Sequence, residues 1–346
     1  MRAVLFSLLL VAVTVVSGAA GARATPAPAG RAVVIVSGGA ATSPFTTPDH
    51  ACASGLAAGN TDTELRRFFL DHGYTVYTSP ALAGRGPVVD QGGFGAFGAC
   101  PITLPENMTV DSTGSIDTAG EHLARFLEYL RKTYGVNDID VVGHSMGGLY
   151  SRAALRVLQS LDSPIRVRSL TTIGTPWQGT YLSDYANGAV PLSDCLDDQF
   201  CQSAMTAFRA EVQRLVAGSG REVNQAFLMG ADGWNEHQAG VLDHIPVTVI
   251  GGARFGAPAP GANPAVWPND GIVALSSALA TDISDRVLPH RRCFTFDDTH
   301  SIYVSDQAGL PWNTGLTWDP RVLAVTRDGI DGAALTTANR TDCPPA

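Results

Sequence analysis

The sequence predicts a single α/β domain built around a mostly parallel sheet of about six strands, with helices on both faces. Six short runs, most of them rich in β-branched or aromatic residues, are apolar without strict alternation, which is typical of strands covered on both sides. Segments with helical periodicity lie between the early runs, and such alternation of strands and helices favours a parallel sheet. We expect the strands at 31–37, 74–78, 139–143, 167–173, 245–251 and 292–296.

Three helices are predicted from periodicity and end signals. Residues 61–72 begin with Thr61-Asp62-Thr63-Glu64, a T-x-x-E capping box, and end before Gly73. Residues 117–134 carry apolar side chains at helical spacing and stop at Gly135. The third helix, at 146–161, directly follows the third strand.

Two long segments interrupt this pattern. Residues 79–116 are a loop rich in glycine and proline, and residues 177–244 form an insertion between the fourth and fifth strands. The insertion contains an apolar stripe at helical spacing that includes Phe208 and Val212. Such a stripe is more often ordinary packing than a substrate contact. We expect the insertion to be lid-like.

Residues 1–24 have the pattern of a secretory signal peptide. Arg2 is the only charge before an apolar run over 4–16, and Ala22-Arg23-Ala24 fits a cleavage site. This run is shorter than the roughly 20 residues that a membrane-spanning helix needs, which argues against the alternative of a retained anchor. We therefore expect a secreted protein without a transmembrane anchor, whose mature chain is one domain at 25–346.

The charge of the chain argues against nucleic acid as a partner. Of the 346 residues, 23 are Lys or Arg and 32 are Asp or Glu, which gives a net charge of −9. Residues 1–24 contain two arginines and no acid, so the mature chain carries about −11. An acidic surface favours solubility and does not neutralise phosphates. We expect a monomer.

Six cysteines in an exported chain predict three disulfides, for which fifteen connectivities exist. We expect Cys195–Cys201 to close a tight loop, Cys293–Cys343 to hold the C-terminal tail, and Cys52–Cys100 to form the third bond. Free thiols or a metal site are the alternatives. The sequence has no C-x-x-C and no Cys/His cluster with zinc spacing, so we expect no metal and no cofactor.

One serine stands at the junction of the third strand and the helix after it. Residues 143–147 have the pattern G-x-S-x-G, in which a serine sits on a sharp turn with its hydroxyl exposed. The helix amino terminus behind Ser145 offers free N–H groups and the positive end of a dipole. A solvated serine in a glycine-rich turn is the alternative. His144 is not expected to be its base, because its side chain leaves the turn in a different direction.

Downstream, an acid and a histidine follow the last two strands. A serine hydroxyl needs a base to take its proton, and the base needs an acid to fix its tautomer. Where a serine sits on such a turn, the chain order is serine, acid, histidine. Asp270 follows the fifth strand and His300 follows the sixth, so both belong at the carboxyl edge of the sheet with Ser145. A simple turn at Asp270 and a surface role for His300 are the alternatives. The weaker histidine candidates precede the acid or the last strand: His237, His244 and His290.

Backbone amides near the serine are expected to hold a developing oxyanion. The loop after the first strand reads Ser37-Gly38-Gly39-Ala40, and glycines let amides approach a ligand closely. We expect the amides of Met146 and Gly39 to form the oxyanion hole, with Gly38 or Ala40 as alternatives to Gly39. Each such donor contributes about 3 kcal/mol to transition-state stabilisation.

Together, Gly-His-Ser-Met-Gly-Gly at Ser145, Asn-Asp-Gly-Ile-Val at Asp270 and the histidine after the last strand resemble the α/β-hydrolase fold. Within it, residues 31–305 look like the secreted bacterial lipases and esterases. One departure is Ser37-Gly38, where such lipases usually have histidine-glycine; this leaves the identity of the oxyanion residue open. Some relatives bind calcium near the histidine loop, but this sequence shows no convincing carboxylate cluster for it.

The resemblance implies hydrolysis of carboxylic esters, often acylglycerols or other lipid esters, through an acyl-enzyme. We expect the insertion, with Trp177, Tyr181, Phe208 and Phe227, to shape or cover the acyl pocket, and the first three to contact the substrate. We also expect residues 177–181 to start a mobile lid, and lipid interfaces to be contacted transiently. The same residues would also serve an acyltransferase, a peptidase or a polyester depolymerase, because fold alone does not decide substrate. A non-catalytic binding protein on the hydrolase scaffold is a further alternative.

Overall fold

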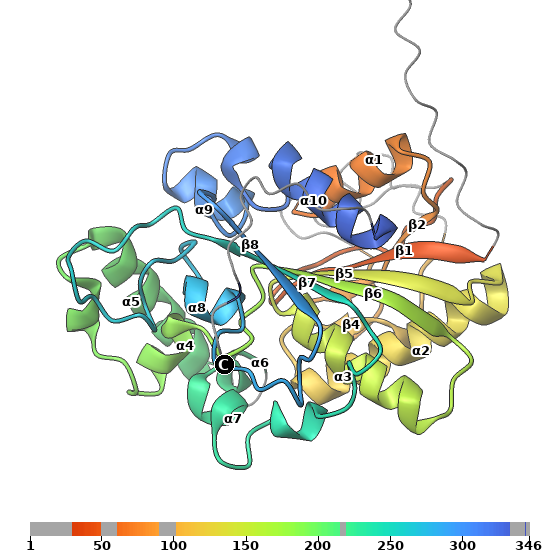
Figure 1. Cartoon of the computed structure of the whole chain (residues 1–346), viewed down its shortest axis with the longest axis horizontal. Helices are drawn as coiled ribbons and strands as arrows, with labels where there is room; N and C mark the ends of the chain where they lie inside the picture. Colours follow the sequence, from red (N-terminus) through yellow and green to blue (C-terminus); the bar gives the residue numbers. More distant parts are fainter. Residues whose placement is uncertain (1–29, 50–60, 90–101, 215–218, 333–342, 344–346) are drawn as a thin grey trace, which may run out of the picture.

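The described part of the chain folds around one six-stranded sheet, in which every neighbouring pair of strands is parallel (Figure 1). This computed structural model describes residues 30–49, 61–89, 102–214, 219–332 and 343. The predicted signal peptide at 1–24 and the predicted Cys52–Cys100 bond lie outside these residues. In sheet order the strands are β2 (Val76–Thr78), β1 (Arg31–Val36), β5 (Asp138–His144), β6 (Arg166–Ile173), β7 (Val247–Gly252) and β8 (Arg291–Phe296). The predicted fold class is confirmed.

Helices cover both faces of this sheet (Figure 1). α1 (Thr63–Asp71) and α10 (Pro320–Asp331) pack on one face, and α2 (Ile116–Tyr134) and α3 (Gly147–Ser160) pack on the other. Along β1, Val33 and Ile35 belong to the apolar core under α1 and α10. Ala32, Val34 and Val36 belong to the core under α2 and α3. Because both faces are buried, residues on both sides of the strands are mostly apolar, which explains their lack of strict polar alternation.

Shorter elements fill the two interruptions. Within the glycine-rich segment, β3 (Ala81–Leu82) pairs with β4 (Val110–Asp111) in a two-stranded sheet that the sequence did not predict. The insertion between β6 and β7 is largely helical. Its elements are α4 (Tyr181–Ala186), η2 (Leu192–Cys195), α5 (Gln199–Arg214), α6 (Ser219–Glu222), α7 (Gln225–Met229) and η3 (Glu236–Gln238). The remaining short elements are η1 (Glu106–Met108), α8 (Leu275–Ala278), α9 (Ile302–Gln307) and η4 (Trp312–Thr314).

The start of α1 differs from the prediction. Asp62, not Thr61, is its N-cap residue, and no side chain caps the helix. The backbone carbonyl of Thr61 instead accepts the hydroxyl of Thr317 at 2.6 Å. The carboxylate of Asp62 is occupied by Ser37, at 2.5 Å. The capping-box prediction was wrong because a tertiary contact takes the place of the local one.

Two of the three expected disulfides are confirmed. Cys195–Cys201 joins η2 to α5 within the insertion. Cys293–Cys343 joins β8 to a residue near the C-terminus. No cysteine of the described residues is free.

We predict that the Cys293–Cys343 bond stabilises the fold by restricting the unfolded chain. The bond spans 50 residues, for which loop-closure entropy gives roughly 4 kcal/mol. Replacing both cysteines by alanine should lower the free energy of unfolding in urea by about 2–4 kcal/mol. Either single variant should lose as much as the double variant, since one missing sulfur already breaks the bond. An unchanged unfolding midpoint in all three variants would contradict the prediction.

Candidate active site

Ser145 stands on a sharp turn between β5 and α3. Its backbone φ is +55°, in the left-handed region that residues other than glycine rarely adopt. A Cβ added to Gly143 would lie 2.6 Å from the amide nitrogen of Gly148, and one added to Gly147 would lie 2.2 Å from the carbonyl oxygen of Val36. The two glycines of the motif are therefore required by close backbone approach. The turn leaves Ser145 half-buried at the carboxyl edge of the sheet.

Asp270 and His300 meet at the same edge, after β7 and β8. Oδ2 of Asp270 lies 2.8 Å from Nδ1 of His300, and both side chains are buried. The backbone repeats the contact, because the His300 amide donates to the Asp270 carbonyl at 2.7 Å. With Nδ1–H directed at the carboxylate, Nε2 of His300 is the nitrogen left to accept a proton.

The carboxylate of Asp270 is held from its other side as well. Its Oδ1 accepts the backbone amides of Ile272 at 3.0 Å and Val273 at 2.7 Å. These bonds orient the carboxylate before any substrate arrives. They also satisfy the second oxygen of a fully buried acid, which would otherwise be costly.

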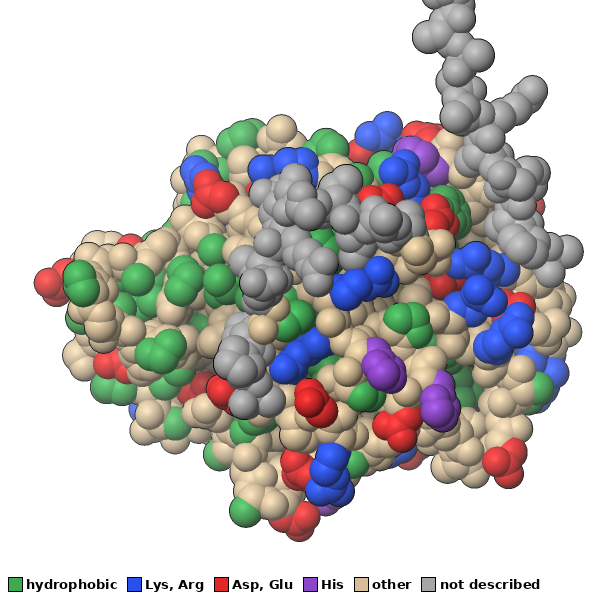
Figure 2. All heavy atoms as spheres, viewed as in Figure 1, with side chains coloured by type: hydrophobic (Ala, Val, Ile, Leu, Met, Phe, Trp, Pro, Cys, Tyr) green, Lys and Arg blue, Asp and Glu red, His purple; other side chains and the backbone are tan. Residues whose placement is uncertain are grey.

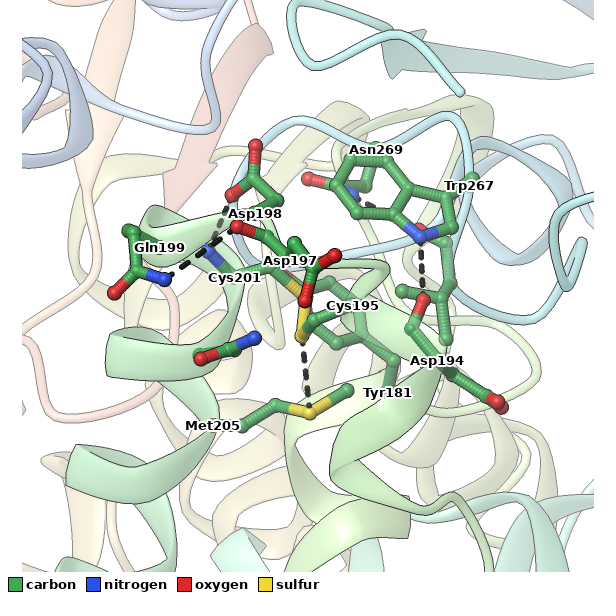
Figure 3. Close-up of a disulfide and its surroundings, with 12 residues drawn as sticks. Tyr181, Asp194, Cys195, Asp197, Asp198, Gln199, Cys201, Met205, Trp267 and Asn269 are labelled. Atoms are coloured by element: carbon green, nitrogen blue, oxygen red, sulfur yellow. Dashed lines mark hydrogen bonds between the residues drawn. A yellow bond between two sulfur atoms is a disulfide. The ribbon is translucent and has the colours of Figure 1, made fainter. Parts of the chain in front are cut away.

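The residues just before Asp270 contact the insertion next to its disulfide (Figure 3). Trp267 donates from Nε1 to the backbone carbonyl of Asp194, next to Cys195, at 2.7 Å. Asn269 accepts the amide of Gly271 at 2.8 Å. The rings of Trp267 and Tyr181 share one apolar cluster with Cys195, Cys201 and Met205. The insertion thus contributes to the position of the candidate acid.

Ser145 and His300 open into one cavity of about 320 Å³. Gly39 and Met146 line it too, so the structure brings all these predicted residues to one place. Much of the remaining wall is apolar: Leu182, Phe208, Val212, Val223, Ile272, Val273 and Val304. A larger hollow of about 610 Å³ includes the start of β6; of the residues considered above, it contains only the weaker histidine candidate His244. It lies at the amino ends of the strands, away from this chemistry.

The amides expected to form an oxyanion hole flank the serine. A Cβ on Gly38 would lie 2.5 Å from Cβ of Ser145, so the loop after β1 packs directly on the turn. The amide of Ala40 is already bonded to the carbonyl of Ser112 at 3.1 Å, which removes this alternative donor. The amides of Gly39 and Met146 have no acceptor among the residues that the structure describes. Gly39 and Met146 remain the predicted pair.

The three residues predicted to contact substrate differ in their placement. Phe208 of α5 lines the cavity. Trp177 and Tyr181 are buried elsewhere and do not line it: Trp177 donates to the hydroxyl of Thr172 at 3.0 Å, and the hydroxyl of Tyr181 donates to the carbonyl of Gly271 at 2.8 Å. Thr180 and Leu182 reach the cavity instead. Both rings are used for packing: Tyr181 lies beside the Asp270 loop, and Trp177 packs under the guanidinium of Arg152 on α3.

His144 supports the candidate base, a role that the sequence did not suggest. Its Nε2 lies 2.9 Å from the backbone carbonyl of His300, to which a neutral ring donates. Burial, and to a lesser extent the nearby His300, lowers the pKa of His144 to about 3. The ring is therefore neutral at ordinary pH, with its proton on Nε2. The sequence argued only against His144 as the base. It could not reveal the contact with His300, because the two residues are 156 positions apart in the chain.

The described part of the surface carries charges of both signs and shows no candidate metal centre. No group of three or more His, Cys, Asp or Glu side chains in the described segments is arranged to hold a metal ion. On the face drawn in Figure 2, basic and acidic side chains are interspersed, and hydrophobic ones gather on the left, around α5. Among helices in the described ranges, none is long and apolar enough to cross a membrane.

A comparison with known families matches the part of the chain that contains β5, the serine turn and α3. Residues 102–192 match the model of a family described as alpha/beta hydrolase fold. The chain has the α/β-hydrolase fold. The candidate site lies where this open sheet places ligands, outside the carboxyl ends of the strands and next to the point between β1 and β5 where strand order reverses.

Relatives of known name match only part of the chain. A triacylglycerol lipase of Pseudarthrobacter phenanthrenivorans is 36% identical over 66 residues, which are 19% of each chain. A triacylglycerol lipase of Burkholderia plantarii is 36% identical over 66 residues, 19% of this chain and 17% of the relative. The match thus spans less than a fifth of the length of either lipase.

Solved structures are similar over more of the chain but at low identity. Bacillus licheniformis lipase BlEst2 in its propeptide form is 15% identical, with a TM-score of 0.49, over 92% of this chain and 54% of that one. A Listeria innocua gene product is 16% identical, with a TM-score of 0.45, over 89% and 96%. Neither likeness carries an argument about function.

We predict that His144 makes stability depend on pH. The group is neutral in the folded chain down to about pH 3, whereas it gains a proton near pH 6.5 when unfolded. The unfolded state therefore binds more protons between these values, and stability falls as pH drops below about 6.5. His144→Gln, which keeps an N–H donor at the same reach, should lose less stability from pH 7 to pH 4.5 than the wild type.

Urea unfolding at both pH values measures this difference. Replacing the exposed His290 by glutamine is the control, and it should change the pH dependence much less. Parallel pH dependence in the wild type and His144→Gln would contradict the burial of a neutral ring.

Proposed function

We propose that this protein is an exported serine hydrolase that cleaves carboxylic esters, with lipid esters such as acylglycerols as its natural class of substrate. The observation that carries the proposal is the 2.8 Å contact between Asp270 and His300, whose ring lines the same mostly apolar cavity as Ser145. The names of the two partial relatives, both triacylglycerol lipases, support the same class. Two disulfides and the signal-like residues 1–24 support export.

In the first half of the proposed reaction, Ser145 attacks the ester carbonyl. Nε2 of His300 takes the hydroxyl proton as the Oγ–carbon bond forms, and Asp270 stabilises the imidazolium that results. The amides of Met146 and Gly39 hold the carbonyl oxygen as it becomes negative. His300 then returns the proton to the leaving alcohol, and the acyl group stays on Ser145.

In the second half, water replaces the alcohol. His300 takes a proton from water, which attacks the acyl carbonyl and forms the same kind of oxyanion. The carbon–Oγ bond then breaks, the acid leaves, and Ser145 recovers its proton from His300. The apolar wall of the cavity receives the acyl chain, which gains free energy by leaving water.

We predict that Ser145→Ala and His300→Ala each lower kcat for p-nitrophenyl butyrate by about 10⁴-fold or more, and Asp270→Asn by about 10³-fold or more. The double variant of Ser145 and His300 should be no worse than either single one, because the two side chains act as one unit. Circular dichroism checks that each variant is folded. Labelling of Ser145→Ala by a fluorophosphonate at the wild-type rate would refute the assignment of the nucleophile.

The size of the cavity predicts a preference for acyl chains of medium length. If each methylene fills about as much space as a water molecule, roughly 30 Å³, then a 320 Å³ cavity holds about ten carbons. Each buried methylene contributes about 0.8 kcal/mol. For p-nitrophenyl esters, kcat/KM should therefore rise by up to about fourfold per methylene and level off near C8–C10.

Phe208→Ala should move this plateau to longer chains, because it enlarges the cavity by removing a ring from its wall. The matched control is Phe227→Ala, which removes a partly exposed ring of the same insertion that does not line the cavity. An identical chain-length profile in the wild type and both variants would show that the acyl chain binds elsewhere.

A further inference from the structure

Three polar side chains are buried together where β1 leaves the sheet. Ser37 follows β1, Ser43 lies six residues later, and Asp62 precedes α1; all three are at most 3% exposed. The Ser37 hydroxyl donates to Oδ2 of Asp62 at 2.5 Å and lies 2.7 Å from the Ser43 hydroxyl. Because a hydroxyl has only one proton to give, Ser43 donates to Ser37 in turn. The result is a chain of hydrogen bonds from Ser43 through Ser37 to Asp62, here called the serine–aspartate chain.

Neither the fold nor the chemistry proposed above uses this acid. Asp62 occupies the N-cap position of α1, but its side chain does not cap the helix. Its Oδ1 is buried and has no partner among the described residues. Burial raises the pKa of Asp62 to about 7, although the bond from Ser37 acts in the opposite direction. Burying a carboxyl group with an unpartnered oxygen costs free energy, so its presence at Asp62 calls for an explanation.

The location of Ser37 provides one. The next residue, Gly38, approaches Ser145 so closely that a Cβ would lie 2.5 Å from the serine Cβ. Before Ser37, the carbonyl oxygen of Val36 would lie 2.2 Å from a Cβ on Gly147. Ser37 therefore joins two backbone segments that are both in direct contact with the serine turn. A shift of the Ser37 side chain therefore also moves the peptide groups that follow it, and these set the position of the Gly39 amide.

The far side of this loop is fixed independently. The amide of Ala40 donates to the carbonyl of Ser112 at 3.1 Å, and the hydroxyl of Ser112 donates to the carbonyl of Ala41 at 2.7 Å. Gly39 lies between this attachment and Ser37. Two anchors, one on each side of the pair Gly38-Gly39, define the direction of the Gly39 N–H.

We propose that the serine–aspartate chain positions the Gly39 amide for oxyanion binding, with Ser37 and Asp62 as positioning residues that do not touch substrate. The inference rests on the proposed ester hydrolysis at Ser145. In this proposal the two sets of contacts have different roles. The Ser112 contacts limit how far the loop after β1 can open, and the serine–aspartate chain sets the orientation of the peptide planes of this loop. A displacement of about 1 Å at such a donor costs up to about a hundredfold in rate.

The test uses the full-length chain and variants that differ in what they remove. Ser37→Ala removes one oxygen and the donor to Asp62. Asp62→Ala removes the acceptor, while Asp62→Asn keeps an oxygen that can accept. The matched control is Ser169→Ala, because Ser169 on β6 is also buried and donates to a buried acid, Asp140, at 2.7 Å, on strand residues away from the cavity.

Ser37→Ala and Asp62→Ala should lower kcat for p-nitrophenyl butyrate about tenfold or more, with KM within about threefold of the wild type. Affinity for a trifluoromethyl ketone, which forms a tetrahedral oxyanion on the serine, should fall by a similar factor in each variant. Asp62→Asn should retain most of the activity. Ser169→Ala should lower the thermal midpoint but leave kcat and inhibitor affinity near the wild-type values.

The inference is overturned if Ser37→Ala, in its folded form, has the kcat and the inhibitor affinity of Ser169→Ala. It is also overturned if Asp62→Asn is as impaired as Ser37→Ala, since an acceptor at this position would then not matter. If Asp62→Ala does not fold, Ser37→Ala alone decides. Ser145→Ala in the same assay keeps the two hypotheses apart: activity in that variant refutes the proposed function, whereas its inactivity beside a fully active Ser37→Ala refutes only the positioning role.

Discussion

The close contact between the start of α3 and the end of β1 is the constraint on which the site depends. The helix approaches the strand so closely that Gly147 leaves no room for a side chain against the Val36 carbonyl. This approach places the amino terminus of α3 beside the loop after β1. Gly39, Ser145 and Met146 therefore line one cavity, next to the positive end of the helix dipole. A larger residue at Gly147 would separate all three at once.

The parallel sheet brings the other two groups to the same edge, where contacts with the insertion help to position Asp270. Every strand of the sheet runs in the same direction, so residues that follow β5, β7 and β8 emerge at one edge although they are far apart in the chain. The order of adjacent strands, β5-β6-β7-β8, leaves β6 between the serine strand and the acid strand. Its following residue, Gly174, lies under the His300 ring, where a Cβ would be 3.0 Å from Nδ1.

The sequence was sufficient for the parts of this arrangement that depend on local pattern and chain order. Apolar runs located the strands to within two residues, and the order serine, acid, histidine selected Ser145, Asp270 and His300 as candidates. It was not sufficient for contacts made only in space. Trp177 looks the same in sequence whether its ring packs on Thr172 or faces a ligand. Asp62 resembled part of a helix cap until its bond to Ser37, 25 residues away, was known. β3 and β4, two residues each, are too short to show any periodicity.

The insertion is fixed to the serine helix at both ends, which limits how it can move. The guanidinium of Arg152, on α3, lies over the rings of Trp177 at 4.3 Å and Trp234 at 4.9 Å. Asn235 accepts from Arg152 at 2.7 Å and donates to the Trp177 carbonyl at 2.8 Å, so the two ends of the insertion are also bonded to each other. Opening these contacts would expose two indole rings to water. These contacts hold Trp177 against the serine helix, whereas Phe208 belongs to α5 in the middle of the insertion. That residues 177–181 start a mobile lid stays a prediction, and opening them would have to break these contacts.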